Sequence, residues 1–452
     1  MKWSLLLPAI LLLGCLSALV GPLMDESQAG DGPGDTSLSL DQAIEITLRQ
    51  NPSLVTQRQG EAVSQAAVGV ASTYPYNPSL QTVVLPYSVN SLGNSVPVQN
   101  SVALLQTVEL AHQQRHREDA ATADFSRTTW SIRRAEALQA AQTERLYFTA
   151  IYQRDLRNMS MLLANVNDEL IGVLERRLSA AQSTATDLAL ARIEARSARQ
   201  QADLAAGSYQ SALAELHTQL GLPQPCFLEP EGDLAARQWF PAPAANSTEL
   251  NPSGDWLSSV TKLVANRPDV MAARAELAAA QAALNLAHAA MVPNLVVGPN
   301  YERDNTGVLM IGVQAQMDLP IVNSGKPLMR QREAEVCQKQ VALDQLFVQA
   351  RLEAEAALAC YDRARTLLER TRNDLSAPLV KDVRQIEDSF RAGQTDLIHV
   401  FTARATLIQA QRGLLDLVNE VAQAAARVSE TTGLPPQLLV QYACPGGAAR
   451  AE

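Results

Sequence analysis

The sequence predicts a mainly α-helical protein with a few membrane β-strands, built from two similar halves. The chain has 452 residues, of which 47% are hydrophobic but only 4% aromatic, and alanine supplies much of the apolar share. Long proline-free stretches carry apolar residues at a spacing of three to four, and short landmarks of the first half recur in the second. Helices that pack closely through alanine along extended interfaces fit this composition better than a globule with an aromatic core.

The charge balance excludes one class of partner. The chain carries 37 Lys and Arg against 47 Asp and Glu, a formal net charge of −10. A protein that binds nucleic acid by neutralising phosphates needs a surplus of cations. We therefore expect no nucleic acid partner, and the 19% of charged residues is typical of a folded chain.

The first residues predict an export signal over 1–29. Lys2 precedes the apolar stretch Leu5 to Leu13, and the chain turns polar at Asp25. Two processing sites stay open: a peptidase site that ends at Ala29, and a lipobox-like Leu-Leu-Gly-Cys whose Cys15 would be lipidated. No later run reaches the ~18 apolar residues of a spanning helix. Any membrane crossing is therefore expected to use strands.

The chain contains a tandem duplication. Four landmarks recur in the same order: residues 51–54 match 267–270, 77–80 match 292–295, 183–188 match 392–397, and 220–223 match 432–435. This order predicts one repeat over 38–223 and a second over 263–440. A linker rich in Pro, Ala and Asn, the equatorial segment, joins them over 224–262, and 441–452 form a tail.

Each repeat is expected to contain a short helix, a strand region, a very long helix, a break and a second long helix. Residues 98–222 contain no proline, and Pro378 is expected to break the corresponding stretch of the second half. Apolar residues form three coiled-coil seams. The seams run through Leu188, Ala191, Ala195, Ala198, Ala202, Ala205, Tyr209, Ala212 and Leu216; through Leu343, Phe347, Ala350, Ala354, Ala357, Tyr361, Ala364 and Leu368; and through Val400, Ala403, Leu407, Ala410, Leu414, Leu417, Val421, Ala424 and Val428.

The strand regions lie between the helices. From Leu309 to Leu319 every odd position is apolar, over the ~10 residues that cross a bilayer as a tilted strand. A run from 295 to 301 precedes it across a turn at 304–307, and the first half offers runs at 80–89 and 96–108. Four strands cannot close a barrel, and lipid does not tolerate an open sheet edge. Several chains must therefore combine, and three would supply twelve strands.

Three segments resemble a known family, the TolC-like outer-membrane factors, or outer membrane efflux proteins, of bacterial tripartite efflux and type I secretion systems. They are residues 38–52, 318–326 and 390–397, and the resemblance spans 38–440. It implies a homotrimer in the outer membrane, with a twelve-stranded barrel above a large periplasmic tunnel of α-helices. It also implies a periplasmic adaptor and an inner-membrane pump, expected to be proton-driven, as partners.

The resemblance also implies a functional site at the tunnel tip. The adaptor contacts would be Ala181, Gln182, Ser183, Gly393, Gln394 and Thr395, and the pore constriction would be formed by Asp187, Asp396, His399 and Thr402. His399 and Thr402 stand where the family frequently has Asp, so an acidic ring would depend on Asp396. The alternatives are that His399 simply faces solvent and that Asp187 is an ordinary carboxylate at a helix start.

No constellation of catalytic residues stands out, so we expect no enzyme, no cofactor and no metal. His112 and His116 are four apart but have no evident third ligand. Cys226 and Cys444 each follow a Gly-Leu-Pro, and both a disulfide and unpaired thiols stay open. The expected function is an exit duct that passes small molecules or metal ions out of the cell. The alternatives are a protein-secretion duct and a periplasmic coiled-coil protein without a channel.

Overall fold

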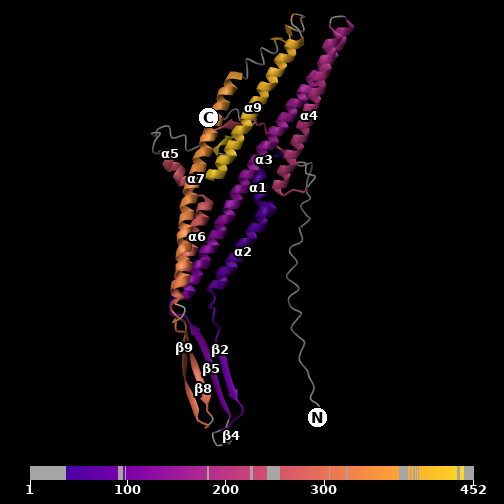
Figure 1. The fold of residues 1–452 in the computed structure, drawn as a ribbon. Helices are drawn as coiled ribbons and strands as arrows, with labels where there is room; N and C mark the ends of the chain where they lie inside the picture. Colours follow the sequence, from indigo (N-terminus) through magenta and orange to yellow (C-terminus); the bar gives the residue numbers. More distant parts are fainter. Residues whose placement is uncertain are drawn as a thin grey trace, which may run out of the picture.

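The computed structural model places helices at one end of an elongated molecule and strands at the other (Figure 1). Several predictions fall outside the residues that it describes: the signal peptide with Cys15, the break at Pro378, and the pairing of Cys226 with Cys444. The structure describes residues 37–89, 95–96, 98–180, 183–223, 228–241, 255–304, 306–321, 324–375, 385–386, 388–389, 392, 394, 397–434 and 438–441.

The helices of the first repeat follow the predicted order. They are α1 (Leu40–Gln50), α2 (Pro52–Ser72), α3 (Gln113–Ser179) and α4 (Ala185–Leu220). Ser39 starts α1 because its side chain forms a capping box with Gln42. Asn51 starts α2 by accepting hydrogen bonds from the backbone N–H groups of Ser53 and Leu54, with Pro52 at the first helical position.

The second repeat has the same order. Its helices are α5 (Asp255–Ala265), α6 (Pro268–Ala289), α7 (Lys326–Leu375) and α9 (Leu397–Thr432). The hairpins formed by α3 with α4 and by α7 with α9 extend in the same direction, away from the strands (Figure 1). None of the described helices combines the length and the apolar character needed to cross a membrane.

The predicted seams agree closely with burial in two helices and only partly in the third. All nine seam residues of α4 are buried, and the α7 seam is buried from Ala350 to Leu368. In α9 only Val400, Val421 and Val428 of the seam are buried, while the other predicted seam residues are half-buried. The prediction for α9 was partly wrong because α9 contacts both α3 and α7, so its buried surface is broader than one stripe. The buried residues outside the seam are Val418, Ala422, Ala425 and Ala426.

The strands form one four-stranded antiparallel sheet in the order β2-β5-β8-β9. They are β2 (Ser79–Leu85), β5 (Gln99–Val108), β8 (Leu295–Arg303) and β9 (Leu309–Met317), and they confirm the predicted strand runs. A short hairpin of β3 (Ser88–Val89) and β4 (Ser95–Val96) extends the first pair. The central pair, β5 with β8, joins the two repeats, and β2 and β9 are the edges.

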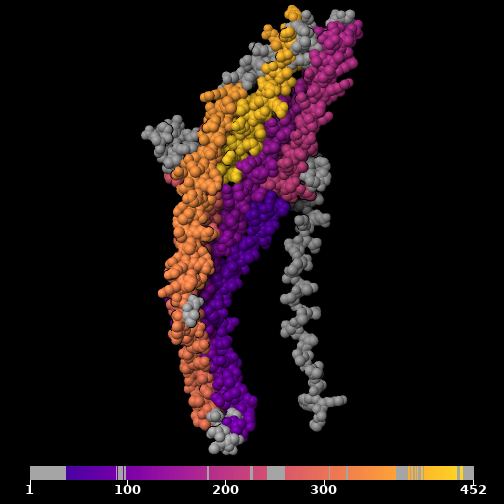
Figure 2. All heavy atoms as spheres, in the orientation of Figure 1, coloured from indigo at the N-terminus to yellow at the C-terminus, as the bar shows by residue number. Residues whose placement is uncertain are grey.

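The sheet leaves large apolar side chains uncovered. Ile311 is 78% exposed and Val313 is 76% exposed on β9, and Leu80 is 69% exposed on β2. Figure 2 shows the strands as a slender extension of the helical body. Apolar surface of this kind is unfavourable in water and favourable in lipid, in agreement with the predicted membrane strands.

Two small sheets fasten the equatorial segment to the helical body. β1 (Ser37–Leu38) pairs with β6 (Glu229–Pro230), and β7 (Gln238–Trp239) pairs with β10 (Val440–Gln441). The hydroxyl of Tyr147 on α3 donates to the carbonyl oxygens of Leu38, at 2.9 Å, and Glu231, at 3.0 Å. The hydroxyl of Tyr361 on α7 donates to those of Phe240, at 2.6 Å, and Leu439, at 3.3 Å. Both repeats therefore hold this segment through a buried tyrosine.

Candidate functional site

The predicted site lies at the end of the hairpins that is farthest from the strands. In the first hairpin, Thr184 starts α4 with a capping box: its hydroxyl accepts from the backbone N–H of Asp187 at 3.2 Å. The Asp187 carboxylate in turn accepts from the Thr184 hydroxyl at 2.7 Å and the Thr184 backbone N–H at 3.1 Å. Ser183 donates to the same carboxylate at 3.3 Å. The structure therefore brings Ser183 and Asp187 together at the turn.

These hydrogen bonds favour the ionised form of Asp187. The bonds from the Thr184 hydroxyl and backbone N–H, in that order, lower the pKa of this carboxylate. The carboxylate also lies at the positive end of the α4 dipole. Asp187 is exposed, so it is a charged group at the hairpin end that stabilises the start of α4.

The second hairpin presents His399 and Thr402 on the first turns of α9. Both side chains are exposed, whereas Val400 between them is only 1% exposed. Gln394 is also exposed, and its backbone N–H donates to the Ser389 carbonyl at 2.9 Å. The other predicted tip and constriction residues lie outside the described part of the chain: Ala181, Gln182, Gly393, Thr395 and Asp396.

A small apolar cluster, the distal core, joins the two hairpins near their ends. Its buried members are Leu170 and Leu174 of α3, Leu188 and Ala191 of α4, and Val400 of α9. Two exposed ion pairs link α3 to α4 beside it, Glu175 to Arg192 at 2.8 Å and Asp168 to Arg199 at 2.7 Å. Exposed pairs of this kind contribute little to stability. The relative position of the hairpin ends therefore depends mainly on the apolar contacts.

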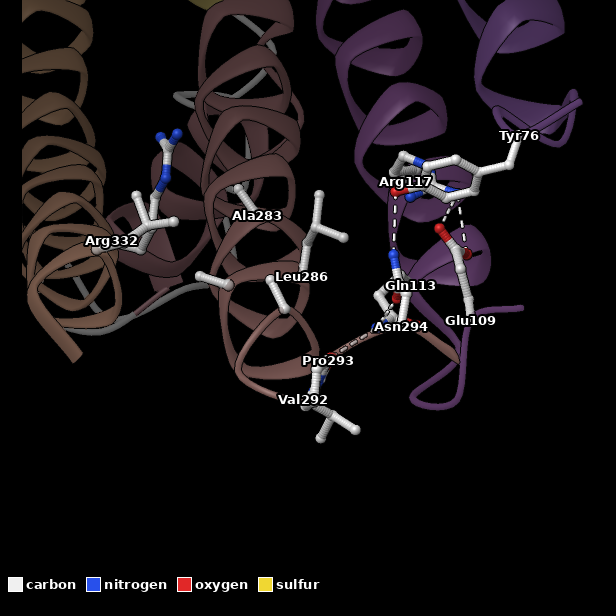
Figure 3. Close-up of a pocket in the computed structure, with 13 residues that line it drawn as sticks. Tyr76, Glu109, Gln113, Arg117, Ala283, Leu286, Val292, Pro293, Asn294 and Arg332 are labelled. Atoms are coloured by element: carbon white, nitrogen blue, oxygen red, sulfur yellow. Dashed lines mark hydrogen bonds and ion pairs between the residues drawn. The ribbon is translucent and has the colours of Figure 1, made fainter. Parts of the chain in front are cut away.

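A pocket of about 390 Å³ lies at the other end of the helical body, where helices meet strands (Figure 3). The side-chain amide of Gln113, the first residue of α3, donates to the carbonyl oxygens of Ala289, at 3.2 Å, and Val292, at 3.3 Å. Arg117 pairs with Glu109 at 2.7 Å. The polar groups of this pocket thus satisfy one another, and they join α3 to the end of α6.

A buried charge network that the sequence did not reveal lies where α6 begins. The side chain of Arg267 is 3% exposed and pairs with Asp269 at 2.6 Å and Glu353 at 3.5 Å. Arg134 of α3 lies 3.7 Å from Asp269, and its guanidinium donates to the carbonyl oxygen of Glu430. The one available signal was that Arg267 takes the place of Asn51 in the duplicated landmark.

No metal centre is evident in the described residues, because no three His, Cys, Asp or Glu side chains there could hold an ion together. His116 lies 4.0 Å from Asp119, and His112 is the residue before α3, with a φ of 56°. Cys337 and Cys360, both on α7, are exposed free thiols.

Comparison with known proteins gives a family match for part of the chain and a fold for most of it. Residues 260–434 match the model of the outer membrane efflux protein family. No curated protein sequence matches the chain.

Several solved structures resemble most of the chain. The CmeC outer membrane channel of Campylobacter jejuni is 15% identical with a TM-score of 0.70, over 87% of this chain and 85% of CmeC. The MtrE outer membrane channel of Neisseria gonorrhoeae is 19% identical with a TM-score of 0.67, over 87% of this chain and 88% of MtrE. The outer membrane protein VceC of Vibrio cholerae is 15% identical with a TM-score of 0.66, over 87% and 96%. These likenesses establish the fold.

Proposed function

Because residues 260–434 belong to the outer membrane efflux protein family and the chain has the fold of outer membrane channels, we propose that it is the exit duct of a tripartite efflux system. The expected fold class is confirmed by the structural likenesses, and the match of residues 260–434 supports the expected family, outer-membrane location and general efflux function. The family consists of transport ducts rather than enzymes. We also propose that the cargo is small molecules or metal ions, and that the duct works with partner proteins.

One observation is the main support for the proposed duct: the four-stranded sheet has two open edges. Unpaired backbone groups at β2 and β9 are costly in lipid, where no water can satisfy them. Three copies that pair β9 of one chain with β2 of the next would close twelve strands. We therefore propose a homotrimer in the outer membrane, with the helices of the three chains extending into the periplasm as a tunnel.

The hairpin ends are proposed to meet a periplasmic adaptor. Ser183 and Gln394 are the described members of the predicted adaptor contacts, and Asp187, His399 and Thr402 are the described members of the predicted constriction. An inner-membrane pump, proton-driven in this proposal, would supply the energy, and the adaptor would hold the hairpin ends apart. Opening exchanges helix contacts for others of similar strength, so adaptor binding of a few kcal/mol is sufficient to shift the population.

The tip assignment is tested by substitution at the second hairpin. Thr395→Glu is expected to abolish efflux from cells that lack any other copy, because a bulky charge would obstruct adaptor docking. Thr395→Ser is the matched control and should transport normally. The amount of assembled protein in the outer membrane is measured for both variants. Full transport by an assembled Thr395→Glu variant would contradict the assignment.

Protein secretion is the alternative cargo class, since a secretion duct can share this architecture. We favour efflux because the matched family is one of efflux proteins. The two cargo classes are separated by comparing cells with and without the chain. Efflux predicts that loss of the chain raises the intracellular concentration of a drug or metal ion, while the set of secreted proteins stays the same.

A further inference from the structure

The strand register assigns each residue of the sheet to one of two faces. Residues paired directly across antiparallel strands point to the same face, and neighbours along a strand point to opposite faces. Tyr301 pairs with Ile311, and Asn300 pairs with Gly312. The lipid face carries Leu295, Val297, Tyr301, Leu309, Ile311 and Val313, with Arg303 at its end. The polar face carries Asn300, Glu302, Gln314 and Gln316, together with the apolar Val296 and Met310.

The polar face must be the one that lines the duct. In outer-membrane barrels the apolar face meets lipid and the interior is polar, because hydrocarbon does not solvate amides or charges. The four long strands, which the structure describes in full, contain two charged residues, Glu302 and Arg303. They are neighbours at the end of β8, so they lie on opposite faces of the sheet, Glu302 on the polar face and Arg303 on the lipid face.

The charge of Glu302 is not compensated within the described chain. Its carboxylate accepts from the side-chain amide of Gln99 at 3.4 Å, and its cross-strand neighbours are Ser101 and Met310. No Lys, Arg or His of the described residues lies within ion-pair distance of it. Glu302 is half-buried and is the second-last residue of β8, a strand that runs away from the helices (Figure 1).

We propose that Glu302 makes the outer mouth of the duct prefer cationic over anionic cargo. The inference rests on the proposed trimeric duct, in which three copies would place three carboxylates around the lumen. Rings of carboxylates favour cations in channels. The amide-rich wall below, with Asn300, Gln314 and Gln316, adds hydrogen-bonding groups without charge.

The test is the charge selectivity of single channels in planar bilayers. At about 0.1 M KCl the screening length is ~10 Å, so a charge mainly affects ions on its own face of the sheet. Glu302→Gln is expected to lower the permeability ratio of K⁺ to Cl⁻, because it removes the negative charge from the lumen face, and Glu302→Asp should keep the wild-type ratio. Arg303→Gln, the matched control on the adjacent residue, should also keep it.

A second variant makes the inference sharper. Glu302→Lys should shift the reversal potential further in the same direction, toward anion preference. The role of Glu302 would be overturned if the permeability ratio of K⁺ to Cl⁻ stayed unchanged in both Glu302→Gln and Glu302→Lys. It would also be overturned if Arg303→Gln changed this ratio by as much as Glu302→Gln does. Wild-type protein without any conductance would instead contradict the proposed duct, so the two failures are distinguishable.

Discussion

The two repeats join their helices at the same positions but with different chemistry. In the first repeat, the side-chain amide of Asn51 donates to the carbonyl oxygen of Gln219 at 2.9 Å. In the second, Arg267 takes the place of Asn51, and its guanidinium donates to the carbonyl oxygen of Thr431 at 3.1 Å. Both residues precede a proline that starts a helix. Both halves thus place a hydrogen-bond donor at this position, an amide in one and a guanidinium in the other.

The difference lies in how much charge is buried. At the first junction the side chain of Asn51 is uncharged, the hydroxyls of Thr47 and Thr143 form a hydrogen bond of 2.9 Å, and the ion pair of Arg58 with Glu136 is partly exposed. The second buries Arg267, which needs Asp269 and Glu353 to offset its desolvation. Loss of one partner from a buried ionic network leaves an uncompensated charge. The second junction should therefore be the more sensitive to substitution.

A third difference between the repeats places the buried ionisable group in the first repeat and an apolar residue in the second. Tyr147 and Tyr361 hold equivalent hydrogen bonds, and three residues before them stand Glu144 and Leu358. Glu144 is 1% exposed and Leu358 is fully buried. Desolvation by burial raises the pKa of Glu144 to about 8. The first repeat thus holds a buried acid where the second holds a leucine.

The largest effect is expected where the repeats meet in the sheet. A Cβ atom at Gly298 of β8 would lie 1.8 Å from the carbonyl oxygen of Leu104 on β5. Gly298→Ala should therefore separate the strands that join the two repeats and abolish assembled protein, as measured by extraction from outer membranes. Gly312→Ala on β9, which meets nothing within 4 Å, is the control and should assemble. Normal assembly of both variants would show that the close β5–β8 approach is not needed.

Removal of Arg267 should have the next largest effect. Arg267→Ala leaves Asp269 and Glu353 without their shared partner, and breaking a buried ion pair costs about 3–5 kcal/mol. Arg274→Ala, an exposed arginine on the same helix, is the control and should cost little. Thermal unfolding of the purified protein in detergent measures both. Equal melting temperatures would contradict the proposed sensitivity of the second junction.

Glu144 should make stability depend on pH. Its pKa is about 8 in the folded protein against a normal value of 4.5, so the folded state binds the proton more tightly than the unfolded state. The stability contribution is full below about pH 4.5 and is lost as the pH rises through about 8. The melting temperature of the wild type should therefore fall between about pH 4.5 and pH 8 and level off at higher pH.

Two substitutions at Glu144 sharpen this prediction. Glu144→Gln should flatten this fall in melting temperature, because an amide does not ionise. Glu144→Leu copies the residue of the second repeat and should flatten it as well. If either variant kept the wild-type dependence of melting temperature on pH, another group would be responsible for the fall.

The smallest effect is expected at Asn51. Asn51→Ala removes both the cap of α2 and the bond to Gln219, and loss of such a cap costs about 1 kcal/mol. Asn51→Ser keeps an oxygen that can cap α2 but loses the bond donated to Gln219, so it should cost less than Asn51→Ala. The shifts in melting temperature measure the two contributions separately. A loss at Asn51 as large as that at Arg267 would remove the contrast between the repeats.

The sequence predicted the features that depend on periodicity. The α4 seam from Leu188 to Leu216 is buried at every predicted position, and the alternation from Leu309 to Met317 forms β9. Repetition reinforced both, because each element had a counterpart in the other half. The α9 seam was predicted less well, since contact with two neighbouring helices broadens the buried surface beyond a single stripe.

The buried charges could not be predicted, because their partners are distant in sequence. Arg267 and Glu353 are far apart along the chain, and nothing near Glu144 distinguishes it from the exposed acids of α3. At the hairpin end, the structure adds the capping role of Asp187 and the exposure of His399. The roles of these residues in adaptor binding and constriction stay predictions, since they depend on contacts beyond one chain.

The central claim is that one chain supplies a third of a membrane duct. It is tested most directly by single-channel conductance of the purified protein in planar bilayers, with the mass of the particle in detergent determined on the same preparation. The account predicts a trimer that conducts, with small or intermittent openings if the hairpin ends rest together. A soluble monomer without conductance would contradict it and leave only the coiled-coil architecture.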